Sequence, residues 1–156
     1  MVLVALFVFT GIAAAQPAPP LLEAYGRAIA LLNFMTSYVG QTLLACAERN
    51  LFTEAQAEAR FAAYRQRNAA LLERAGSWRA QAEKRLHALG HEEAAQERAD
   101  AAGMSAASVA LARVKQEIDK ANDVRALCAA RVEGIESGRY DLSVNPDFVG
   151  LLKENP

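Results

Sequence analysis

The sequence predicts an all-α protein, and three observations carry this prediction. Alanine, the residue with the highest helix propensity, is the commonest apolar residue of the chain. No proline occurs between residues 21 and 145, and a proline inside a helix costs about 3 kcal/mol. Apolar residues recur at steps of three and four along this stretch, as on amphipathic helices. With 156 residues the chain is long enough for one domain with its own core.

Residues 1–15 have the features of a signal peptide. The run VLVALFVFTGIAAA is apolar and ends in small residues before Gln16, as at a cleavage site. It is shorter than the roughly 20 residues that span a membrane. No lysine or arginine precedes it, so an uncleaved anchor, which would hold the protein at a membrane, remains the alternative. Residues 16–19 form a proline-rich linker, and residues 20–156 are expected to form a single helical domain.

The first helix is expected over Pro20–Asn50. Its apolar residues form one stripe, comprising Leu22, Tyr25, Ile29, Leu32, Met35, Val39, Leu43 and Cys46. Further apolar residues widen this stripe, so we expect the first helix to be the most buried element. Tyr25 and Tyr38, like Tyr64 further on, are interpreted as core aromatics whose hydroxyls reach outward.

A second helix is expected to begin at Thr53. Thr53 and Gln56 have the spacing of a capping box, in which each side chain bonds the other's backbone amide. Asn68 falls on the apolar stripe of this helix, either buried, where it would fix the packing register, or at the edge of the stripe. The helix is expected to continue past Gly76 to Leu89.

The capping segment also resembles a known motif. Phe52-Thr53-Glu54-Ala55-Gln56 is similar to the L-T-x-x-Q motif of small periplasmic helical stress proteins, the Spy and CpxP chaperone family. The resemblance covers five residues in one copy, with Phe52 in place of leucine. It implies a chaperone-like binding role and does not by itself assign the chain to the family.

Gly90 is expected to end the second helix, and a third begins near His91 and ends before Gly138. The expected apolar stripe of the third helix comprises Met104, Leu111, Val114, Ile118, Ala121, Leu127 or Cys128, Val132 and Ile135. The tail holds Asn145 as a helix cap, with Pro146 at the first helical position. We expect a short terminal helix that docks on the end of the bundle; a partner-binding peptide is the alternative.

Residues 77–102 contain few large apolar side chains. The expected fold is therefore an up-down-up three-helix bundle with a long projecting αα-hairpin, whose tip is residues 77–102. Its core helices are Pro20–Asn50, Thr53–Ala75 and Met104–Ser137. Breaks at Gly76 and Gly103 would instead give a compact four-helix bundle.

The two cysteines are predicted to form a disulfide. In an up-down-up bundle the first and third helices are parallel, so Cys46 and Cys128 approach the same end. An even number of cysteines in an exported protein favours pairing, whereas free thiols would accompany an intracellular location. The expected location is the periplasm or the extracellular space.

Few residues have the type and spacing expected of a metal site or an active site. Glu83, His87 and His91 are spaced four apart, as metal ligands on one helix face can be, although Gly90 is expected to turn the chain between the histidines. No catalytic motif or cofactor-binding fingerprint is recognised, so we expect neither an enzyme nor a cofactor. The net charge of −1 and the alternating signs argue against a nucleic-acid partner.

These observations predict an exported helical protein of the cell envelope that acts by binding another macromolecule. The partner is expected to be a protein or a second copy of the chain. The expected contact residues lie on the hairpin: Trp78, Leu86 and Leu89. The alternative function is a periplasmic metal-binding or metal-sensing protein that uses Glu83, His87 and His91.

Overall fold

Six α-helices and one 3-10 helix form the part of the chain that the computed structural model describes, residues 20–153 and 156. The elements are α1 (Pro20–Ala47), α2 (Glu54–Arg67), α3 (Ala69–Ala88), α4 (Glu92–Asp119), α5 (Val124–Glu136), the 3-10 helix η1 (Leu142–Val144) and α6 (Pro146–Leu151). The described residues contain no strand, and the all-α prediction is confirmed. The predicted signal peptide 1–15 and the linker 16–19 lie outside the described residues.

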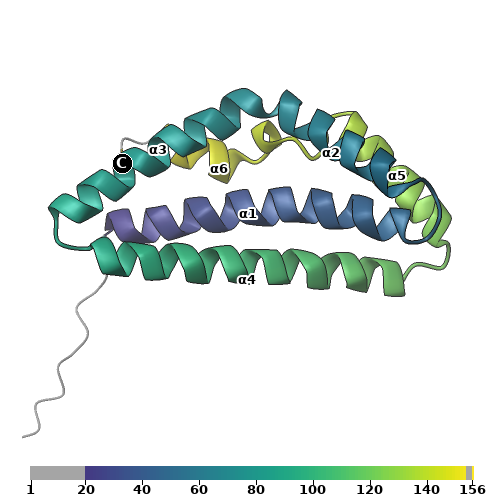
Figure 1. Ribbon diagram of the computed structural model, residues 1–156, viewed down its shortest axis with the longest axis horizontal. Helices are drawn as coiled ribbons and strands as arrows, with labels where there is room; N and C mark the ends of the chain where they lie inside the picture. The colour runs from purple at the N-terminus through teal and green to yellow at the C-terminus, as the bar shows by residue number, and fades with distance from the viewer. Residues whose placement is uncertain (1–19, 154–155) are drawn as a thin grey trace, which may run out of the picture.

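Helix α1 runs through the middle of the molecule. Helix α4 lies along one side of it, and α2 and α3 form an arch over the other side (Figure 1). The predicted stripe is buried at Leu22, Tyr25, Ile29 and Leu43, which explains this central position. By length and composition α1 would also cross a membrane, but this is weak evidence, because core helices and signal sequences meet the same criteria.

The arch consists of two helices, where the sequence predicts one. Thr53 caps the N-terminus of α2, and both hydrogen bonds of the predicted capping box are present. The helix then breaks at Asn68, whereas α3 runs through Gly76 without interruption. The amide of Asn68 bonds Tyr64 O at 2.9 Å, as short polar side chains do when they compete with the helical backbone.

The predicted projecting hairpin packs against the core instead, but the breaks at Gly76 and Gly103 that the compact four-helix alternative required are absent, because α3 and α4 run through these glycines. Four alanines of α3 and α4 are buried against α1: Ala75, Ala82, Ala95 and Ala99. The same core cluster contains Leu22, Tyr25 and Ile29 of α1 and Trp78 and Leu86 of α3. Alanine side chains allow helices to approach closely, so a segment poor in large apolar residues still forms a core. Gly90 ends the helix as predicted, with a φ of 76°.

The predicted third helix is also two helices. Helix α4 ends at Asp119, and Asp123 caps α5 by accepting a hydrogen bond from Ala126 N at 2.9 Å. The stripe prediction is right for Val114 and Ile118, which are buried. It is wrong for Met104 and Leu111, which are exposed, because alanines form the buried face of α4 there.

The terminal segment folds back under the arch rather than onto the end of the bundle. Asn145 caps α6 and Pro146 begins it, as predicted. Helix α6 lies between α1 and α3 (Figure 1), and Leu142 and Phe148 are fully buried there. The segment is therefore part of the core.

Candidate functional site

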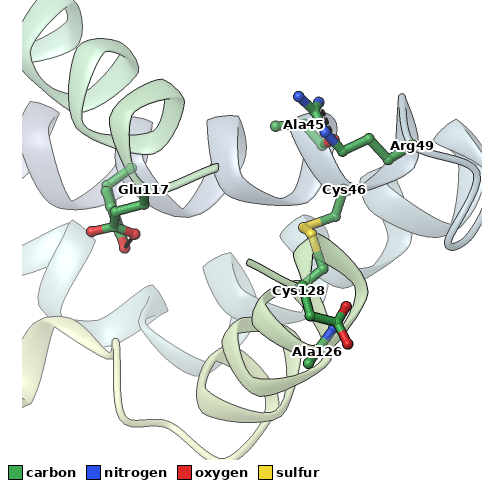
Figure 2. The surroundings of a disulfide bond; sticks show 8 residues. Ala45, Cys46, Arg49, Glu117, Ala126 and Cys128 are labelled. Carbon is green, nitrogen blue, oxygen red and sulfur yellow. Dashed lines mark hydrogen bonds between the residues drawn. A yellow bond between two sulfur atoms is a disulfide. The ribbon is translucent and has the colours of Figure 1, made fainter. Parts of the chain in front are cut away.

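The structure joins Cys46 to Cys128, with a Cα–Cα distance of 5.8 Å, and the predicted disulfide is confirmed. Figure 2 shows Cys46 on α1 bonded to Cys128 on α5. The two cysteines meet in a different way from the predicted one, because Cys128 lies on a separate helix, α5, and not on a continuous third helix parallel to the first. Helix α5 turns back after α4, and this return brings Cys128 against the last turn of α1. The disulfide therefore fixes the start of α5, one turn before Arg131.

Beside α5 lies a pocket of about 360 Å³ between α1, α4, α5 and residues 139–147. We call it the arginine–aromatic pocket. Its lining combines guanidinium groups, aromatic rings, apolar side chains and two further polar residues: Arg113, Arg131 and Arg139; Phe34, Tyr38 and Tyr140; Met35, Val39, Val144 and Pro146; Asn145 and Asp147.

The aromatic rings of the pocket pack against one another. The Tyr38 ring lies 6.0 Å from the Phe34 ring and 5.8 Å from the Tyr140 ring, between centroids. Tyr140 approaches α5 at Gly134, where a Cβ atom would lie 2.6 Å from the Tyr140 ring. Arg131 donates a hydrogen bond to the Tyr140 hydroxyl. A glycine on α5 thus allows Tyr140 to reach its place in the pocket.

Glu117 of α4 organises the charged side of the pocket. Its carboxylate accepts hydrogen bonds from the Tyr38 hydroxyl at 2.7 Å and from Arg113 Nε at 3.1 Å. Arg131 Nη2 lies 2.9 Å from the same carboxylate. Burial opposes ionisation of Glu117, but these hydrogen bonds outweigh it, and its pKa lies below the ordinary value. Burial, and the hydrogen bond to Glu117, raise the pKa of Tyr38 above 10.0.

The pocket has an excess of hydrogen-bond donors. Arg113 and Arg131 share the single carboxylate of Glu117. The Nε of Arg131 is buried and has no hydrogen-bond partner among the described residues. Within the described part of the chain, Arg139 pairs only with Glu133, at 3.4 Å between two exposed side chains, which is a weak interaction. Guanidinium groups with unused donors are suited to bind carboxylate or phosphate oxygens.

A buried asparagine holds residues 139–147 in place. Asn68 donates to Asp141 at 3.1 Å and accepts from Leu142 N at 2.7 Å. Arg67 pairs with the same Asp141 at 3.3 Å. Asn68 is therefore buried, as the first of its two sequence interpretations required, and it links the α2–α3 junction to the wall of the pocket.

The predicted contact residues are distributed differently from expectation. Trp78 and Leu86 are buried in the core and do not lie on the surface of this chain. The reason is that the segment 77–102 packs along α1. Leu89 remains exposed, at 62% of its surface, beside the turn at Gly90.

Two of the three candidate metal ligands, Glu83 and His87, have other partners. Glu83 accepts hydrogen bonds from Tyr25 at 2.6 Å and from Arg79 at 2.7 Å. His87 Nδ1 lies 2.7 Å from Glu92 Oε2. Within the described residues, no group of three or more histidine, cysteine, aspartate or glutamate side chains is arranged to hold a metal ion.

Sequence reasoning missed the arginine–aromatic pocket because its residues come from distant parts of the chain. Arg113 and Arg131 are 18 positions apart, on two helices that the sequence predicts as one (131 − 113). On a continuous helix they would lie about 27 Å apart, at 1.5 Å per residue. The turn at Asp123 brings both to Glu117. The pair Asn122-Asp123, with the cap-forming aspartate, was the local signal of that turn.

Comparison of the chain with protein-family models, with curated proteins and with solved structures finds no match. The motif resemblance of residues 52–56 thus rests on those five residues, and the observed capping box at Thr53 explains their pattern.

Proposed function

We propose that this protein is an exported, non-enzymatic protein of the cell envelope that acts by binding another macromolecule. The single observation that carries the proposal is the arginine–aromatic pocket. It combines exposed guanidinium groups with apolar surface, and such a combination gives both orientation and affinity to a binding site.

Export is supported by two features. The apolar run that ends at Ala15 has the pattern of a signal peptide. The Cys46–Cys128 disulfide fits an oxidising compartment, because disulfides are rare in reducing cytosols. The intact mass of the protein from cells, with and without reductant and thiol alkylation, tests both. We expect loss of residues 1–15 and two thiols that react only after reduction. A retained segment with free thiols would contradict export.

Binding is tested by photocrosslinking in cells. A photoreactive amino acid replaces Val144, which is 55% exposed at the pocket, or Val109, which is 54% exposed on α4 and does not line the pocket. We expect a defined higher-mass adduct from position 144 and none from position 109. The same adducts from both positions, or none from either, would exclude the pocket as a macromolecular binding site.

A further inference from the structure

We propose that the arginine–aromatic pocket recognises a carboxylate joined to a compact apolar group. Two sources supply this chemistry: the C-terminal residue of a polypeptide, and a free aryl carboxylic acid. The inference rests on the proposed function, because it names the ligand of the same pocket.

The charge of the pocket selects a single negative charge. Arg113 and Arg131 share the single carboxylate of Glu117, so this cluster has an excess of one positive charge (2 − 1). The charge of Arg139 is offset by its ion-pair partner, the exposed Glu133. A carboxylate balances this excess, whereas a phosphate dianion would add repulsion from Asp147. The planar guanidinium group also matches the two oxygens of a carboxylate.

The remaining lining selects an apolar group next to that charge. The Phe34, Tyr38 and Tyr140 rings, with Val144 exposed at the rim, offer aromatic and aliphatic surface a few ångströms from the guanidinium groups. Arg113 already lies over the Tyr38 ring, 5.6 Å from its centroid. An aromatic ligand would find flat partners on both the protein rings and the guanidinium planes.

The volume limits how much of a ligand enters. About 360 Å³ is at the lower end of small-molecule sites, which suits one side chain with its carboxylate. A folded domain would contact only the rim. A polypeptide C-terminus can place its last residue in the pocket while the rest of the chain stays outside.

Calorimetric titration of the full mature protein tests the proposal with three probes. They are 3-phenylpropionate, the peptide acetyl-Ala-Ala-Phe with a free carboxylate, and the same peptide as its C-terminal amide. Loss of a charged hydrogen-bond partner should weaken binding at least about tenfold, so the amide should bind that much more weakly than the acid. Equal affinity of acid and amide, or no binding of either carboxylate, would overturn the proposal.

Two arginine variants test the location. Arg113→Met should weaken carboxylate binding about tenfold, and Arg139→Met, at an exposed position, should also weaken it. The matched control is Arg79→Met. Arg79 likewise pairs with a glutamate four residues later, and that glutamate also accepts a tyrosine hydroxyl, but Arg79 lies outside the pocket. The control should bind as the unchanged protein does. Equal affinities of Arg113→Met and Arg79→Met would place the ligand elsewhere.

The probes also separate this inference from the proposed function. If phenylpropionate binds and the peptide acid does not, the carboxylate site stands and its ligand is a free aryl carboxylic acid; the macromolecular function then fails only if position 144 also gives no crosslink. If position 144 crosslinks a partner but neither carboxylate binds, the function stands and the ligand assignment is wrong.

Discussion

At the scale of single residues, two similar clusters connect α1 to its neighbours. In each, a buried tyrosine of α1 donates to a glutamate that also pairs with an arginine four residues earlier: Tyr25 with Glu83 and Arg79, and Tyr38 with Glu117 and Arg113. The predicted burial of these tyrosines is confirmed, and their hydroxyls reach half-buried carboxylates. Tyr64 differs, because its buried hydroxyl has no hydrogen-bond partner among the described residues.

Tyr25→Phe and Tyr64→Phe should therefore have opposite effects on the free energy of unfolding. Tyr25→Phe removes a hydrogen bond to a charged group and should destabilise the protein by about 1.5 kcal/mol or more. Tyr64→Phe removes an unsatisfied buried hydroxyl and should be neutral or stabilise by up to about 1 kcal/mol. Urea unfolding of both variants at neutral pH measures the difference. Equal losses would mean that the Tyr64 hydroxyl has a partner.

The same tyrosines predict how stability falls in alkali. Burial raises the pKa of Tyr64 to about 12, and burial with the Glu83 hydrogen bond raises that of Tyr25 to about 12. Above pH 10 the unfolded chain loses these protons while the folded protein keeps them. The free energy of unfolding should then decrease as pH rises from about 10 to about 12, by up to about 1.4 kcal/mol per pH unit for each tyrosine.

Urea midpoints between pH 8 and pH 11.5 measure this slope. The double variant Tyr25→Phe/Tyr64→Phe is the control, and its slope should be shallower. An unchanged slope would show that other groups dominate the alkaline transition.

At the scale of secondary-structure elements, the positions of the helix breaks decide which side chains meet. The break at Asn68 lets its side chain bond the segment that carries Tyr140, and the break at Asp123 returns α5 to α1. Glycines inside helices are not the breaks: α3 passes through Gly76, and α5 passes through Gly134. Their surroundings nevertheless differ, and alanine substitutions should show it.

Gly76→Ala and Gly134→Ala form a matched pair. A Cβ atom at Gly76 meets nothing within 4 Å, so alanine should stabilise the protein by about 0.5–1 kcal/mol through its helix propensity. At Gly134 the Cβ would collide with the Tyr140 ring, and alanine should destabilise by about 1–3 kcal/mol. Thermal unfolding measures both. Stabilisation by Gly134→Ala would show that Tyr140 moves away without cost.

At the scale of the whole molecule, one covalent bond connects the central helix α1 to α5. The disulfide joins residues 82 positions apart, so it restricts a large part of the unfolded chain. It also holds α5, whose Arg131 and Gly134 shape the arginine–aromatic pocket. Stability and pocket geometry are therefore expected to depend on the same bond.

Reduction of the disulfide should lower the free energy of unfolding by about 2–5 kcal/mol. Urea unfolding with and without reductant measures this loss. The control is the double variant Cys46→Ser/Cys128→Ser, which should start from the lower stability and not respond to reductant. A reductant effect of the same size in that variant would rule out the disulfide as its cause.

Turns and helix caps that depend on a few neighbouring residues were predictable from the sequence. The capping box at Thr53, the turn at Gly90 and the cap at Asn145 each depend on a few adjacent residues, and all three are present. The pairing of Cys46 with Cys128 was also predictable, since the chain contains only two cysteines. The pocket was not, because its residues come from four separate segments, and no local pattern relates them.

The sequence by itself determined that the chain is helical, where most helices begin, and that the two cysteines pair. Helix propensity and capping act within one or two turns, so the order of residues is enough to specify them. Only the tertiary structure decided that residues 77–102 pack inward and that Arg113 and Arg131 share Glu117. Close packing of alanine faces and the return of α5 depend on which helix surfaces meet, and that is a property of the whole fold.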